Sequence, residues 1–320
     1  MPVAWSKNKP IPESYEFVLP LSTVTRDLKD FADTYGETCV SYGAHDVDSG
    51  SMWYYYRPNR RRCELNNEDV IRAVATSVPS VLQTNGQYPE YDQVWKDGRL
   101  EVVAIFGRAD ENKPPSDDIG TRNFRVFISK IKEMIPNAIQ IPESFEGELG
   151  VDVTEMMIEG QIDESRFVSV TILVVDNVRT ADRQFRERYK SLTPTADLII
   201  YNGHAGLGQN IRALASRGEW KAEQYVIVFM NGCDTYAYVD DALYAAHREV
   251  NPDDETGTRY VDLVTNAMPA YFFDMTGASM ALVDALAKPD EPASYDEIFK
   301  NIAREQMVLV TGEEDNVFQP

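Results

Sequence analysis

The chain has few of the features that mark membrane or metal-binding proteins. Among its 320 residues are three histidines and three cysteines. No apolar stretch approaches the ~20 residues that a membrane-spanning helix needs, so we expect no membrane span. Residues 1–6 also lack the apolar segment of a signal peptide, and we expect no signal peptide in this sequence.

Basic side chains are scarce as well. The sequence holds 31 Lys and Arg residues against 52 Asp and Glu residues, which gives a formal net charge of −21 at pH 7. Because a surface this acidic repels phosphate backbones, we expect no nucleic-acid partner. The one dense basic run, residues 57–62, is interpreted as a solvated loop.

The three cysteines fall into two groups. Cys39 and Cys63 lie in the first quarter of the chain, whereas Cys233 stands alone. Our hypothesis is a Cys39–Cys63 disulfide that leaves Cys233 as the free thiol. A disulfide would indicate an oxidising compartment, and therefore export to the periplasm, the cell surface or the medium. The alternative is a cytoplasmic protein with three reduced cysteines.

The rest of the composition is that of a globular protein, 43% hydrophobic and 26% charged. The length allows two modest domains. We expect a small N-terminal α/β region over residues 1–97 and a main domain over residues 98–320, with a boundary near Gly98. In the first region, the spacing of apolar residues predicts a strand at residues 15–21 and a helix at residues 66–81.

From Gly98 onward, apolar runs alternate with helical patterns. Residues 100–106 and 167–175 are typical of buried strands, and residues 123–135 carry apolar side chains at helical spacing. Such alternation favours an α/β fold with a doubly wound sheet.

Two consecutive apolar runs in the second half each end in a glycine and then a reactive side chain. Residues 197–203 precede His204, and residues 225–232 precede Cys233. Residues 210–218, between them, have helical spacing and end in a glycine stop signal. A right-handed strand–helix–strand crossover makes the two strands parallel. His204 and Cys233 should then emerge side by side at the carboxyl ends, where open α/β sheets place their ligand crevices.

A histidine beside a cysteine places a base next to a nucleophile. The thiolate attacks, and a neighbouring imidazolium lowers the pKa of a thiol into the working range. This pairing is most useful for acyl transfer, that is, hydrolysis of peptides or amides.

At these residues the sequence resembles the caspase-like cysteine peptidases, which include caspases, legumain, clostripain, separase, gingipains and the CHAT-domain proteases. The motifs are Tyr201-Asn202-Gly203-His204-Ala205-Gly206 and Asn231-Gly232-Cys233-Asp234-Thr235. The resemblance covers about residues 98–320. It implies the caspase–haemoglobinase fold, a parallel sheet flanked by helices, and a cysteine endopeptidase with His204 as base and Cys233 as nucleophile.

The resemblance also implies an oxyanion hole built from backbone N–H groups. Ala205 stands where the family usually has glycine; alanine keeps the N–H donor but loses glycine's freedom in φ. The expected donors are the N–H groups of Ala205 or Gly206 and of Cys233. Asp234 follows the nucleophile and, as an anion, would raise the pKa of Cys233. No third catalytic residue that would complete a triad is evident from the sequence.

Two other functions remain alternatives. One is a non-catalytic binding protein on a caspase-like scaffold, which the alanine at 205 favours. The other is a nucleotide-binding α/β enzyme that cradles phosphate in the glycine-rich loop at residues 203–208, although the glycine order differs from the dinucleotide fingerprint. The oligomeric state stays open.

We expect no metal and no other cofactor. The segment His45-Asp46-Val47-Asp48 is interpreted as a turn. Acidic clusters such as residues 253–255 and 313–315 lack the spacing of an EF-hand loop. Calcium remains an alternative because some members of the resembling family bind it.

Overall fold

The computed structural model describes residues 12–40, 56–78, 86–303 and 306–320. The chain divides into two compact units, Met1–Gln83 and Thr84–Pro320. The sequence predicted a boundary near Gly98, but the division falls earlier, between Gln83 and Thr84. The reason is that the segment before Gly98 packs into the larger unit: Tyr91 and Val94 are buried in its core, and the Trp95 indole donates to the Leu286 carbonyl at 2.8 Å.

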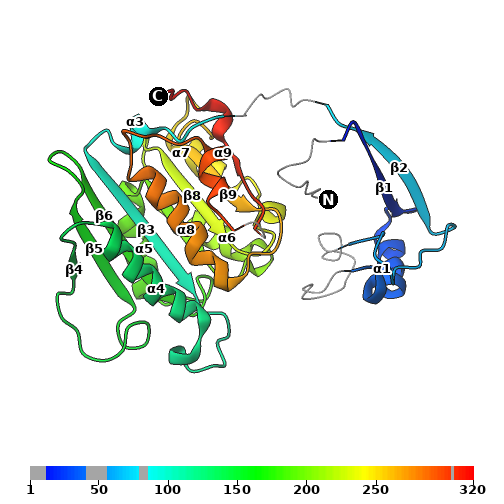
Figure 1. Cartoon of the computed structure of the whole chain (residues 1–320), viewed down its shortest axis with the longest axis horizontal. Helices are drawn as coiled ribbons and strands as arrows, with labels where there is room; N and C mark the ends of the chain where they lie inside the picture. Colours follow the sequence, from blue (N-terminus) through cyan, green and yellow to red (C-terminus); the bar gives the residue numbers. More distant parts are fainter. Residues whose placement is uncertain (1–11, 41–55, 79–85, 304–305) are drawn as a thin grey trace. The chain divides into compact units, whose positions relative to one another are not determined.

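In its described residues, the smaller unit contains a two-stranded antiparallel sheet and one helix (Figure 1). Its elements are β1 (Ser14–Pro20), α1 (Thr25–Cys39) and β2 (Val70–Thr76). The prediction of a helix at residues 66–81 is therefore wrong for residues 70–76, which form β2. The residues that suggested an apolar helix face are β-branched, which favours strands. Two of them, Ile71 and Val74, are 49% and 69% exposed rather than packed in a core.

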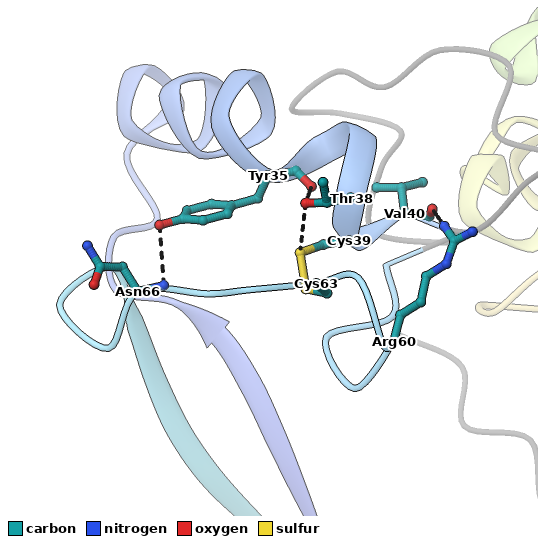
Figure 2. Close-up of a disulfide and its surroundings, with 7 residues drawn as sticks. All are labelled: Tyr35, Thr38, Cys39, Val40, Arg60, Cys63 and Asn66. Atoms are coloured by element: carbon teal, nitrogen blue, oxygen red, sulfur yellow. Dashed lines mark hydrogen bonds between the residues drawn. A yellow bond between two sulfur atoms is a disulfide. The ribbon is translucent and has the colours of Figure 1, made fainter.

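Cys39 and Cys63 form a disulfide in this unit, as expected (Figure 2). Cys39 ends α1 and is completely buried among Phe31, Tyr35 and Tyr56. The basic run at residues 57–62 forms turns beside the disulfide. Within it, Arg60 donates to the Val40 carbonyl. The segment His45-Asp46-Val47-Asp48 lies outside the described residues.

The larger unit is built on an eight-stranded sheet with the order β10-β9-β8-β7-β3-β6-β5-β4. The five central strands, β9 to β6, are mutually parallel, and β5 and β10 pair antiparallel to their neighbours. The strands are β3 (Arg99–Gly107), β4 (Ile139–Ile141), β5 (Glu155–Gln161), β6 (Phe167–Val175), β7 (Leu198–Asn202), β8 (Val226–Asn231), β9 (Val261–Asn266) and β10 (Val308–Thr311).

Helices cover both faces of this sheet, so the fold is α/β with a mostly parallel sheet, as predicted (Figure 1). One face packs against α4 (Ile119–Met134), α8 (Phe272–Leu286) and α9 (Tyr295–Lys300), and the other against α5 (Arg183–Leu192), α6 (Gln209–Arg217) and α7 (Ala242–Val250). A short helix, α3 (Tyr91–Val94), precedes β3.

Strand β3 shows why its apolar run is continuous. Val102, Ala104 and Phe106 lie in the core beneath α4 and α8, whereas Val103 and Ile105 lie in the core beneath α5 and α6. Since successive side chains point to opposite faces, a strand covered on both sides needs apolar residues at every position. Among the described residues, no helix is both long and apolar enough to cross a membrane.

Candidate active site

The strand–helix–strand unit predicted around the two motifs is present. Strands β7 and β8 are parallel, and Asn202 pairs in register with Asn231. His204 and Cys233 each follow two residues after this pair, so both leave the sheet at the same carboxyl edge. The Gly203 N–H still donates to the Asn231 carbonyl at 3.2 Å, which continues the pairing into the loops.

Gly232 allows the two loops to approach closely. A Cβ built on it would lie 2.7 Å from the Gly203 carbonyl oxygen and 3.2 Å from the Ala205 nitrogen. Any larger residue would push the histidine loop away from the cysteine loop. The close approach of the two loops therefore requires glycine before Cys233, and the Ala205 amide lies beside that glycine.

The His204 ring is exposed and oriented by one backbone carbonyl. Its Nε2 lies 2.9 Å from the oxygen of Ala109, in the loop after β3. Because a carbonyl oxygen only accepts, Nε2 must carry the proton, which leaves the lone pair of the neutral ring on Nδ1. The ring also packs edge-to-face on Phe272, with centroids 5.2 Å apart.

This contact lies at the topological switch point of the sheet. From β3 the chain adds β6 on one side, then crosses to β7 on the other. Adjacent loops leave in opposite directions at such a point, and the crevice between them is the usual ligand site of an open α/β sheet. The Ala109 loop and the His204 loop form its two sides.

The backbone of His204 is fixed by buried side chains. The Tyr201 hydroxyl donates to the His204 carbonyl at 2.9 Å, and the Asn210 amide donates to the same oxygen at 2.6 Å and to the Tyr201 hydroxyl at 3.0 Å. Tyr201 and Asn210 are each 2% exposed. Hydrogen bonds this well buried hold the imidazole on a rigid support while its ring stays open to solvent.

Cys233 is a free, half-buried thiol. It donates to the Ala270 carbonyl, in the loop after β9, over 3.5 Å. Burial raises the pKa of Cys233, and the anionic Asp234 beside it raises the pKa further. The resting thiol is therefore protonated at neutral pH.

The described residues include no hydrogen bond between His204 and Cys233. Each side chain is instead bonded to a carbonyl from a third loop, His204 to Ala109 and Cys233 to Ala270. The structure thus places both expected residues at one edge, on adjacent loops, with their side chains bonded to separate backbone carbonyls.

A layer of buried amides supports both loops from below. Asn202, Asn231 and Asn266 end the three adjacent strands β7, β8 and β9. The Asn231 amide donates to Asn202 at 2.8 Å, and its oxygen accepts from Asn266 and from Gln306, each at 3.0 Å. All four side chains are buried. The strand ends are therefore fixed to one another through neutral groups.

The backbone at residue 205 does not need the conformational freedom of glycine. Ala205 has φ −67° and ψ −27°, an ordinary right-handed conformation that alanine adopts without strain. The positive φ of 59° falls on Gly206 instead. The glycine freedom that the loop needs is thus retained one residue later.

No group of three or more His, Cys, Asp or Glu side chains that could hold a metal occurs in the part of the chain that the structure describes. In the acidic cluster at residues 253–255, Asp253 and Asp254 bind groups of the same loop. Asp254 accepts from the N–H groups of Gly257 at 2.9 Å and Arg259 at 3.1 Å, and Asp253 pairs with Arg259 at 2.8 Å.

Sequence reasoning missed two participants, Ala109 and Ala270. Both act through backbone carbonyls, so their side chains carry no chemical signal. The only available clue was positional: each lies in a loop that follows a strand of the parallel sheet, and such loops converge on one edge.

Comparison with known proteins adds no relative. No protein-family model matches the chain, and no curated protein sequence is significantly similar to it.

Proposed function

We propose that the protein is a cysteine endopeptidase of caspase-like type, with His204 as base and Cys233 as nucleophile. The observation that carries the proposal is the bond from His204 Nε2 to the Ala109 carbonyl. It fixes the tautomer whose Nδ1 can take a proton, on the loop next to the only free thiol among the described cysteines.

The reaction would follow the usual course of acyl transfer. A peptide binds across the carboxyl edge, Nδ1 of His204 accepts the thiol proton, and the Cys233 sulfur attacks the peptide carbonyl carbon. His204 then returns the proton to the leaving amine as the C–N bond breaks, which leaves a thioester on Cys233. Water, deprotonated by His204, hydrolyses the thioester and restores the thiol.

The negative oxygen of the tetrahedral intermediate needs hydrogen-bond donors. The N–H groups of Ala205, Gly206 and Cys233 are the candidates. The closeness of the Ala205 nitrogen to Gly232 supports a hole formed between the two loops. Tyr271 and Phe273, 41% and 70% exposed, flank the Phe272 that touches His204 and would border the bound peptide.

The raised pKa of Cys233 makes the resting enzyme weakly nucleophilic. Activity therefore depends on transfer of the proton to His204 when a substrate draws the two side chains together. Catalytic hydrogen bonds are commonly long or absent without substrate and form in the complex.

The test uses a pooled peptide library with products read by mass spectrometry. Wild type should cleave it, and Cys233→Ala and His204→Gln should reduce cleavage at least about 10³-fold, the loss typical of a triad member. Glutamine at 204 is the informative change, because its amide can still donate to the Ala109 carbonyl but cannot accept the thiol proton.

A sharp control is Asn301→Ala, an exposed residue of the same unit, which should cleave like wild type. Undiminished cleavage by Cys233→Ala or His204→Gln would refute the dyad.

A binding protein on the same scaffold is the second candidate. The hydrogen bond of the Cys233 thiol to Ala270, rather than to His204, favours it. A thiol-reactive peptidyl inhibitor separates the two candidates. Labelling of Cys233 that requires His204 indicates a peptidase, and labelling no faster than that of a free thiol indicates a binding protein.

The Cys39–Cys63 disulfide also bears on where the protein works. Disulfides persist in oxidising compartments, which supports the proposal that the protein works outside the cytoplasm on protein or peptide substrates.

A further inference from the structure

One buried carboxylate outside the dyad accepts from backbone N–H groups of two segments, the first turn of α4 and the loop after β3. Asp118, 1% exposed, is the N-cap of α4 and accepts from Gly120 at 2.8 Å and Thr121 at 3.2 Å. These two bonds are all that helix capping requires. The same carboxylate also accepts from the N–H of Ala109 at 3.0 Å and of Asp110 at 3.0 Å.

The bond to Asp110 is the informative one. The Asp110 N–H belongs to the same peptide group as the Ala109 carbonyl, and that carbonyl accepts from His204 Nε2. One peptide group therefore receives the Asp118 carboxylate on its N–H and the His204 imidazole on its oxygen. A carboxylate on the N–H polarises the amide and makes its oxygen a stronger acceptor, since hydrogen bonds in a chain reinforce one another.

Neighbouring contacts keep this peptide group in place. Arg108, 8% exposed, donates to the carbonyls of Asp110 and Lys113 and pairs with Asp176 at 2.9 Å. A Cβ on Gly120 would lie 2.2 Å from the Gly107 carbonyl oxygen, so the start of α4 packs directly on the end of β3. The loop after β3 is thus clamped between a helix terminus and a buried guanidinium.

We propose that Asp118 is a positioning residue that orients and polarises His204 through the Ala109–Asp110 peptide group. It does for the imidazole what a carboxylate does in a triad by direct contact, holding the Nε2–H tautomer and stabilising the imidazolium that forms during acyl transfer. The inference rests on the proposed peptidase function, but the tautomer that it predicts does not depend on activity.

The test compares Asp118→Asn with Asp182→Asn. Asp182, which is exposed, caps α5 by accepting from the Phe185 N–H at 2.8 Å and is not bonded to the histidine or cysteine loops, so it is a helix-cap control away from the candidate site. In Asp118→Asn the side-chain oxygen can still cap α4. The amide that replaces the other oxygen can no longer accept from Asp110.

The first readout is nitrogen NMR of the full chain labelled at histidine. Three histidines give a simple spectrum, and His204→Gln identifies the His204 signals. Wild type and Asp182→Asn should show His204 as the Nε2–H tautomer above neutral pH, and Asp118→Asn should show a mixture of tautomers. Unchanged His204 signals in Asp118→Asn would overturn the proposal whether or not the protein cleaves peptides.

The second readout is peptide cleavage. In Asp118→Asn we expect kcat to fall about tenfold with KM changed less than about twofold, because binding groups are untouched. An equal loss in Asp182→Asn would point to weakened helix capping and would overturn the proposal. Thermal unfolding of both variants checks that each is folded. If wild type cleaves nothing while the tautomer shift occurs, the positioning role stands and the peptidase function fails.

Discussion

The two ends of the parallel sheet bury polar side chains in different ways. At the carboxyl end, the buried groups that join the strand ends beneath His204 and Cys233 are neutral amides, of which Asn231 takes part in the most hydrogen bonds. At the amino end, Asp262 in β9 is completely buried and accepts from the hydroxyls of Tyr225 and Tyr295, each at 2.5 Å.

The ionisable end has a structural task. Asp262 also accepts from the Asn316 amide at 2.7 Å, and Asn316 donates to the Tyr88 carbonyl at 2.8 Å. These bonds tie the last residues of the chain and the segment before β3 to the sheet. Burial raises the pKa of Asp262 to about 6. Asp262 lies at the end of the sheet opposite His204 and Cys233.

The neutral end supports the loops of the candidate site. Amides fix the strand ends without adding charge, so they do not alter the protonation of the nearby thiol and imidazole. The layer directly beneath the two loops is therefore neutral, whereas the buried cluster at the amino end is ionisable. Two acidic residues lie closer to the site: Asp118, which supports the Ala109–Asp110 peptide group, and Asp234, directly beside Cys233.

The largest effect should come from breaking the amide layer. Asn231→Ala leaves Asn202, Asn266 and Gln306 without their shared partner, and buried unsatisfied groups are costly. We expect the free energy of unfolding to fall by about 3 kcal/mol in urea denaturation. Asn301→Ala, which removes one exposed hydrogen bond to the Glu297 carbonyl, should change it by less than about 0.5 kcal/mol. A similar small change in both variants would contradict the comparison.

Ionisation of Asp262 at the amino end should make the stability of the protein depend on pH. Because the folded pKa of Asp262 is raised, the folded state holds the proton more tightly than the unfolded state. Its stabilising contribution is complete below about pH 4 and is lost as the pH rises through about 6. In Asp262→Asn the side chain cannot ionise, so the free energy of unfolding should not fall in this way as the pH rises.

Between pH 4 and pH 7, wild type should therefore lose about 2 kcal/mol relative to Asp262→Asn. Urea denaturation of both proteins at several pH values measures the difference. Parallel stability curves would show that Asp262 does not titrate in this range.

The smallest effect should come from removing the charge of Asp234, the acidic residue beside Cys233 at the carboxyl end. Asp234 has φ 53° and raises the pKa of Cys233. Asparagine tolerates this left-handed backbone conformation, so Asp234→Asn removes the charge with little strain. The pKa of Cys233 should fall, and alkylation by iodoacetamide at neutral pH should become about threefold faster because more of the thiol is ionised.

Alkylation reports on Cys233 alone, because Cys39 and Cys63 are paired. His204→Gln provides the reference for any contribution from the imidazole. An unchanged or slower rate in Asp234→Asn would show that the carboxylate does not act on the thiol.

The extent of sequence prediction differed between the units for a physical reason. The strand–helix–strand unit from β7 to β8 was predicted because continuous apolar runs bounded by glycine occur when strands are buried on both faces. Strand β2 was missed because it carries valines and isoleucine on a partly exposed sheet, where apolar periodicity does not report burial.

The sequence by itself determined the alternation of strands and helices, the free cysteine and the placement of His204 and Cys233 at one edge. These features follow from local patterns and from the handedness of crossovers. Only the tertiary structure decided what surrounds them. The Ala109 carbonyl, the Asp118 carboxylate and the Ala270 carbonyl come from loops after β3 and β9 or from the start of α4. Their roles depend on backbone atoms meeting across distant segments, and backbone atoms are the same at every residue.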